Sequence, residues 1–243
     1  MLLRLITCLF ILTQAPTYAA DFEGLHDDGK WEFIKEKKGF KVYSRPMPGS
    51  NVLGFKVEGY IDAPIIDIMS TLRDVNLSKE WQPDLLEKVT IKDLGDLEAI
   101  TYSRVDMPWP LDDRDYVIHN KLMVHKKKKL LFVLSKSVSK KGWESGRRAV
   151  RANIGYSNIG LRPAGEKKTY VEWTLFGEPN GNIPDWVVNF YQQTFPIKFF
   201  KHLAKRANKK KLPIPAGFKV ILAELEEVLN EKDGRKVSSK PKK

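Results

Sequence analysis

The chain has 243 residues and a formal net charge of +12, because 42 lysines and arginines outnumber 30 aspartates and glutamates. This surplus favours an anionic partner, such as a membrane surface, lipopolysaccharide or nucleic acid. Cys8 is the only cysteine, so the composition excludes an internal disulfide framework and a cluster of thiolates around a metal.

The N-terminus is predicted to be a secretory signal peptide comprising residues 1–19. Arg4 supplies positive charge, residues 5–12 are mostly apolar, and residues 14–20 are polar and small. The apolar run is much shorter than the roughly 20 residues that span a bilayer. Cleavage is expected after Ala19, which places Thr17 at the third residue upstream. We therefore expect a periplasmic or secreted protein with no cysteine in its mature form and no nucleic-acid partner.

The mature chain is predicted to begin with a short helix over Trp31–Lys38, followed by strands over Lys41–Arg45 and Val52–Ile61. The second strand alternates in polarity with a period of two, which is typical of a hairpin partner. Asp62 is then expected to cap a helix that has Pro64 in its first turn. The apolar residues of that helix are Ile65, Ile66, Met69 and Leu72.

From Leu85 the pattern predicts an antiparallel meander of short strands with tight turns. The strands are expected over residues 85–94, 98–106, 115–124, 130–138, 149–163 and 169–177. No repeat or interdomain linker interrupts them. We therefore predict one domain over residues 22–210.

Residues Ile183–Ala207 are predicted to form a long amphipathic helix with a broad aromatic face and a kink at Pro196. A further helix, Val220–Leu229, is expected within a C-terminal extension over residues 211–232, and residues 233–243 read as a disordered basic tail. A sheet with one apolar face needs a cover, and the long helix can supply it. The fold class is therefore α+β, with a curved antiparallel sheet gripping the C-terminal helix and a hollow between them.

The motifs of the common catalytic sites are missing from the sequence. There is no Gly-x-Ser-x-Gly, no His-Glu-x-x-His and no glycine-rich phosphate loop, and the four histidines share no ligand spacing. We expect no catalytic residue, no metal and no cofactor.

The stretch Met107–Val117 is the strongest candidate for a binding element. Its two prolines form a stiff turn that delivers Arg114 to the head of a strand. Two interpretations stay open for this arginine. It pairs at the surface with Asp112, Asp113 or Asp115, or it points into a cavity and holds the polar group of an apolar ligand.

Other candidates are charged or polar residues on the strands and aromatic residues that form either core or cavity wall. Tyr102 and Arg104 share one face of their strand, and Arg151 and Asn153 share a face of theirs. The aromatic candidates are Trp109, Trp173, Trp186 and Phe190.

Several motifs in order make the chain similar to the START domains, the lipid-transfer domains related to the steroidogenic acute regulatory protein, within the helix-grip superfamily. The matching segments are Trp81 with Pro83, Met107–Leu111 with Arg114–Val117, Asn158–Gly160 with Arg162–Pro163, and Pro179–Asn189. The likeness covers Trp31–Ala207. It implies a curved sheet around a tunnel for one lipid or sterol-sized molecule, with Arg114 near the cavity and the C-terminal helix with its preceding loop as a lid. It also implies no cofactor and, for most members, no chemistry. The better-known members are cytosolic or organellar, whereas this chain is expected to be exported.

Three functions are compatible with these features. The first is a monomeric, non-enzymatic periplasmic carrier or sensor of a hydrophobic ligand, with transient contact to an anionic membrane through lid aromatics and Lys205–Lys211. The second is a cyclase or hydrolase-type enzyme that uses Asp106 or Asp115 with Tyr102. The third is a regulatory module whose ligand moves the lid to engage a partner.

Overall fold

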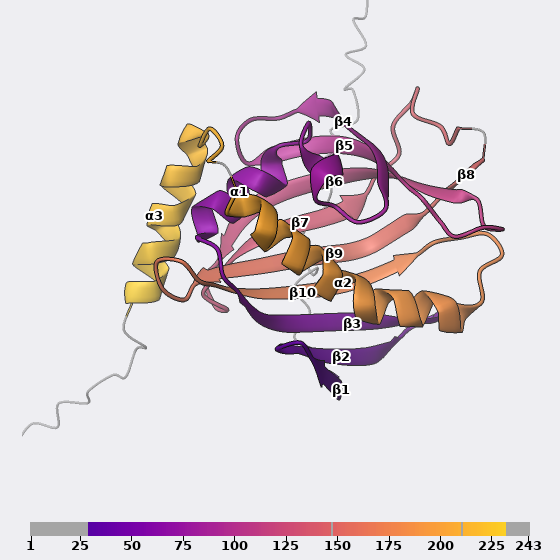
Figure 1. The fold of residues 1–243 in the computed structure, drawn as a ribbon, viewed down its shortest axis with the longest axis horizontal. Helices are drawn as coiled ribbons and strands as arrows, with labels where there is room; N and C mark the ends of the chain where they lie inside the picture. Colours follow the sequence, from indigo (N-terminus) through magenta and orange to yellow (C-terminus); the bar gives the residue numbers. More distant parts are fainter. Residues whose placement is uncertain (1–28, 147, 210, 232–243) are drawn as a thin grey trace, which may run out of the picture.

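The computed structural model describes residues 29–146, 148–209 and 211–231 (Figure 1). The predicted signal peptide, its cleavage site and the predicted basic tail lie outside the described residues.

The N-terminal part is a meander of β1 (Glu32–Lys37), β2 (Phe40–Met47) and β3 (Ser50–Ile61). The predicted helix over Trp31–Lys38 is therefore wrong. Lys38 and Gly39 both have positive φ, 55° and 79°, as a two-residue hairpin turn requires. This turn pairs Lys37 with Phe40, and the hairpin hydrogen bonds outweigh the helix propensity of the lysines and glutamates.

The next elements are the helix α1 (Ile65–Arg73) and a short 3₁₀ turn, η1 (Ser78–Glu80). The predicted cap at Asp62 is wrong, because α1 begins after Pro64 and has no side-chain cap. The Pro64 carbonyl instead accepts the first backbone hydrogen bonds, from Asp67 and Ile68.

The meander continues in one large sheet, which confirms the predicted fold class. Its strands are β4 (Leu85–Asp93), β5 (Glu98–Val105), β6 (Asp113–His125), β7 (Leu130–Ser137), β8 (Ala149–Arg151), β9 (Asn153–Pro163) and β10 (Thr169–Glu178). The strand order is β1-β2-β3-β10-β9-β7-β6-β5-β4. The single strand predicted over residues 149–163 is divided at Ala152, because β8 pairs in parallel with β6, while β9 runs antiparallel to β7 and β10.

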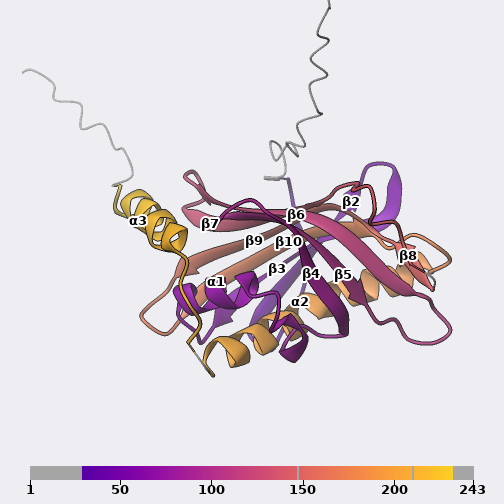
Figure 2. The same cartoon turned by 90° about the horizontal axis from the view of Figure 1, so that it is seen from above.

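Two helices follow the sheet, α2 (Asp185–Ala207) and α3 (Ala216–Asn230). Figures 1 and 2 show α1 and α2 on the same side of the sheet, with α3 at the end near α1. The helix α2 packs against β3 and α1 and buries Phe200 and Leu203 completely. Pro196 lies inside α2, where the kink stays a prediction.

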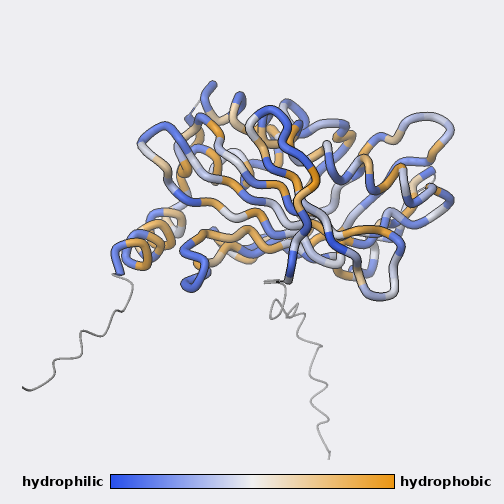
Figure 3. The backbone as a smooth tube through the Cα atoms, turned by 90° about the horizontal axis from the view of Figure 1, so that it is seen from below, coloured by the Kyte–Doolittle hydropathy of each residue, from blue (hydrophilic) through white to orange (hydrophobic). Residues whose placement is uncertain are grey.

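A second, smaller apolar cluster lies on the opposite face of the sheet and joins Ile100, Tyr102 and Val117 to Trp143. Apolar clusters therefore occupy both faces of this part of the sheet. Figure 3 shows short hydrophobic and hydrophilic stretches following one another along the chain. Because both faces of β5 are buried, alternation along that strand does not reveal which face is turned to α2.

Candidate ligand-binding cavity

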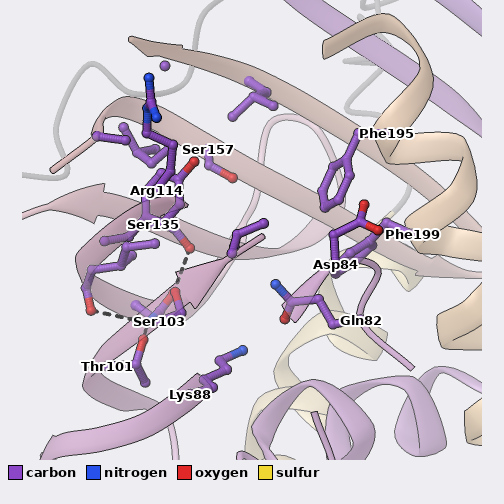
Figure 4. Close-up of a pocket in the computed structure, with 18 of the residues that line it drawn as sticks. Gln82, Asp84, Lys88, Thr101, Ser103, Arg114, Ser135, Ser157, Phe195 and Phe199 are labelled. Carbon is purple, nitrogen blue, oxygen red and sulfur yellow. Dashed lines mark hydrogen bonds between the residues drawn. The ribbon is translucent and has the colours of Figure 1, made fainter. Parts of the chain in front are cut away.

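A cavity of about 770 Å³ lies between the sheet and α2, within the range of roughly 300–1,000 Å³ that is typical of small-molecule sites. Strands β4, β5, β6, β7, β9 and β10, the helices α1 and α2, and the loop before β6 supply its wall, and α3 adds Phe218. Figure 4 shows Phe195 and Phe199 of α2 facing the polar strand residues across the hollow. Apolar residues that line it include Met69, Leu72, Val105, Ile118, Val133, Ile159, Leu175, Val187 and Val188.

Part of the polar wall is satisfied within the protein. Asn120 donates from Nδ2 to Thr101 Oγ1 (3.1 Å) and accepts at Oδ1 from Ser135 Oγ (2.8 Å). Trp173 donates from Nε1 to Ser157 Oγ over 2.8 Å. These pairs let hydroxyl and amide groups lie in an apolar wall without the cost of unpaired burial.

Other polar atoms of the wall have no partner in the described part of the chain. Trp81 Nε1 and Gln192 Oε1 are both buried and unpaired there, although Gln192 also donates from Nε2 to the Gly177 carbonyl. A buried donor or acceptor without a partner costs roughly 1–3 kcal/mol. A ligand or water that pairs with these atoms would remove that cost.

Arg114 lies at one end of the cavity and is 2% exposed. The hydrogen bonds of its guanidinium go to backbone carbonyls and not to the carboxylates of Asp112, Asp113 or Asp115. Its place in the cavity lining agrees with the second interpretation, and its contact with a ligand stays a prediction. Its Nε donates to the Pro179 carbonyl (2.6 Å), its Nη2 to the Asn180 carbonyl (2.8 Å), and its Nη1 to the Asp112 carbonyl (2.6 Å). The guanidinium therefore fixes the loop before α2 through its backbone carbonyls.

The loop accommodates this arginine through Gly181. Its φ is +70°, and an added Cβ would lie 3.2 Å from Arg114 Nη2. A residue with a side chain would be strained in this conformation and would crowd the guanidinium.

The structure divides the predicted aromatic residues into two groups. Trp173 lines the cavity and packs against Phe199, with the ring centroids 4.7 Å apart. Trp109 lies at the cavity mouth and is 92% exposed, while Trp186 and Phe190 lie on α2 outside the lining and are 73% and 63% exposed.

The predicted polar strand residues lie outside the cavity lining. Arg104 forms an ion pair with Asp113 (2.6 Å), and Arg151 donates to both carboxylate oxygens of Asp115, at 2.8 and 3.2 Å. Tyr102 reaches the same carboxylate at 3.4 Å. The remaining candidate is Asn153, which is exposed at the start of β9 and does not line the cavity.

The Asp115 carboxylate is fully buried on the face away from the cavity. Burial alone would raise the pKa of Asp115, but hydrogen bonds from Arg151 and Ser145 hold it below its ordinary value. Asp115 and Tyr102 thus belong to a structural ion-pair network.

Asp106 lines the cavity mouth and is exposed. The described residues also contain no cluster of histidine, cysteine or carboxylate side chains fit for a metal.

Sequence reasoning missed the polar residues that do face the hollow, chiefly Lys88, Ser103 and Tyr116. Strand parity contains the signal, since Thr101, Ser103 and Val105 occupy the alternate positions to Ile100, Tyr102 and Arg104. The cluster around Trp143 buries the opposite face of β5. Residues on that face therefore appeared equally suitable for a ligand site.

An antiparallel sheet that grips a long helix over a large apolar cavity defines a helix-grip protein with an internal ligand site. The START domain profile matches residues 23–212. A protein of Pseudomonas aeruginosa, PA1579, is 30% identical over 180 residues, covering 74% of this chain and 88% of its own. The bovine phosphatidylcholine transfer protein is 23% identical over 184 residues, covering 74% and 85%.

Solved structures show the same fold. Human STARD10 superposes with a TM-score of 0.67 at 20% identity, covering 82% of this chain and 80% of its own. A STAR-related lipid transfer protein fragment from Xanthomonas axonopodis gives 0.63 at 26% identity, covering 74% and 99%. The chain belongs to the START domain family.

Proposed function

We propose that this protein binds one lipid or sterol-like molecule in the cavity beneath α2 and carries it, without chemical conversion and without a cofactor, as a monomer in the periplasm. The observation that carries the proposal is the cavity itself, about 770 Å³ with a mostly apolar wall. Burial of ligand surface at roughly 25 cal/mol per Å² supplies affinity. Relatives named as lipid or phosphatidylcholine transfer proteins support the same ligand class.

Exchange with a membrane is the second part of the proposal. The loop that carries Trp109 and the first half of α2 both border the cavity mouth, and Trp186 and Phe190 project their rings into solvent. Exposed aromatic rings favour the membrane interface. None of the helices in the described part of the chain combines the length and apolar character needed to cross a membrane, so we propose contact at the surface.

The test is native mass spectrometry of the purified protein, with extraction of any bound lipid. We expect a stoichiometric lipid, or uptake of one after delipidation. An Ala152→Phe variant places a ring in the cavity wall, where Ala152 is buried, and should lose most of this uptake. Ala149→Phe is the matched control, since Ala149 lies outside the lining. The proposal fails if no lipid binds, or if Ala152→Phe binds as well as the wild type while folded.

A further inference from the structure

Three side chains form a row across β4, β5 and β6 on the cavity wall. Lys88 is paired in register with Ser103, and Ser103 with Tyr116, and all three line the cavity. Residues directly opposite on neighbouring strands share a face and have Cβ atoms about 4.5–5.5 Å apart. Figure 4 shows Lys88 beside Thr101 and Ser103, with its side chain directed into the pocket.

The row offers one ammonium and two hydroxyls. Within residues 29–146, 148–209 and 211–231, none of these three side chains has a hydrogen-bond or ion-pair partner. This distinguishes Lys88 from Lys121, the other lysine of the lining, which lies 4.0 Å from Glu98.

The acidic groups around Lys88 have other partners. Asp74 accepts from the Leu77 amide, Asp84 pairs with Lys198, Asp96 accepts from the Gly217 amide, and Glu98 binds His119. Asp106 is exposed at the mouth, and the nearby cation Arg73 pairs with Asp93.

Burial lowers the pKa of Lys88 to about 8, as expected for a cation removed from water without a counter-charge.

A mostly apolar cavity in which the Lys88 ammonium has no acidic partner among the described residues is suited to an amphiphile with an anionic end. An anionic oxygen between Lys88, Ser103 and Tyr116 would receive charge-assisted hydrogen bonds and would offset the cost of burying the ammonium. A choline group would instead need aromatic faces or acceptors, and the ammonium would repel it.

Building on the proposed function, we propose that the Lys88–Ser103–Tyr116 row binds the headgroup of a net-anionic lipid, a phosphate monoester or a carboxylate, and so sets the ligand class. Free phosphate offers the same oxygens but fills none of the apolar hollow, so the lipid form is the ligand.

The experiment compares phosphatidic acid with phosphatidylcholine of the same acyl chains, using the delipidated full chain and native mass spectrometry. Wild type should prefer phosphatidic acid about tenfold or more, and Lys88→Met should remove that preference while still binding phosphatidylcholine. Lys92→Met is the matched control, because Lys92 is an exposed lysine of the same strand outside the lining, and it should keep the preference. Inorganic phosphate should not displace phosphatidic acid.

A pH series on the unmodified protein tests the same point without a variant. The probe is a hexadecyl sulfonate, whose charge does not change with pH. Its affinity should fall as the pH rises through about 8, the pKa of Lys88, because the neutral amine no longer attracts the anion. An equal affinity for both lipids, an unchanged preference in Lys88→Met, or a flat pH series overturns this proposal while lipid binding itself stands. Absence of all lipid binding overturns both proposals.

Discussion

Arg114 determines the position of a loop far away in sequence. Its guanidinium donates to the carbonyls of Pro179 and Asn180, more than sixty residues further along the chain, and is almost completely buried. These bonds hold the entry to α2, and so one end of the cavity. A planar fork with fixed donor directions is needed for this, and a lysine ammonium cannot reproduce it.

We therefore expect Arg114→Lys to lower the free energy of unfolding by roughly 2–4 kcal/mol, since buried carbonyls lose charged hydrogen-bond partners. Urea denaturation monitored by fluorescence measures the change. Arg104→Lys is the control, because this arginine is partly exposed in its ion pair with Asp113, and it should cost less than about 1 kcal/mol. Equal costs for the two variants would contradict the role assigned to Arg114.

At this scale the sequence identified positions better than roles. The two prolines before Arg114 correctly indicated a stiff turn leading into a strand, but nothing local reveals that its donors meet Pro179 and Asn180. Lys88 was missed because a lone lysine on a strand has no sequence signature. It becomes notable only when register places it beside Ser103 in a cavity.

Among the secondary-structure elements, α3 is the one that lies beyond the START match, which ends at residue 212. It packs against β6 and β7 and buries Phe218, Ile221, Leu225 and Val228. No side chain of its own caps its start. Asp96, in the turn after β4, does so instead by accepting from the Gly217 amide at 2.7 Å. The fit is close, since a Cβ on Gly217 would meet Asp96 Cβ at 2.8 Å.

Asp96→Ala should loosen α3 from the sheet. Loss of a capping carboxylate costs about 1 kcal/mol, so amide hydrogen exchange along Ala216–Leu225 should speed up about fivefold. Hydrogen-exchange mass spectrometry gives the rates. Asp62→Ala should leave them unchanged, as the Asp62 side chain is exposed and makes no hydrogen bond among the described residues. Unaltered exchange in Asp96→Ala would show that the cap is unimportant.

Helices and strands were predictable wherever apolar residues recurred with a clear helical or strand period over many residues. The strands of the meander and the two C-terminal helices were expected near their observed positions. The error at Trp31–Lys38 arose because a six-residue edge strand with exposed lysines and glutamates has no alternating pattern of its own and depends on its partner β2. The short parallel pairing of β8 with β6 likewise depends on contacts between strands that local pattern cannot supply.

For the molecule as a whole, the proposed association with membranes should depend on charge. The net charge of +12 attracts anionic lipid surfaces, and the exposed rings of Trp109, Trp186 and Phe190 offer apolar contact after arrival. Raising the salt from about 0.1 M to about 1 M shortens the Debye length from about 10 Å to about 3 Å.

Cosedimentation with phosphatidylglycerol vesicles should therefore fall strongly over this range of salt. Phosphatidylcholine vesicles are the control, and their weaker binding should change little. Salt-independent binding to the anionic vesicles would assign the contact to the aromatic rings alone.

Phe218, in the first turn of α3, would couple the docking of this helix to the binding of the proposed ligand. This ring is part of the cavity wall. A ligand that binds more tightly when α3 is docked would stabilise the docked helix, and by reciprocity the docked helix would raise the affinity for that ligand by the same factor. A ligand with a hydrocarbon chain too short to reach Phe218 would bind without affecting the docking of α3. The docking of this helix would then depend on the length of the bound hydrocarbon chain.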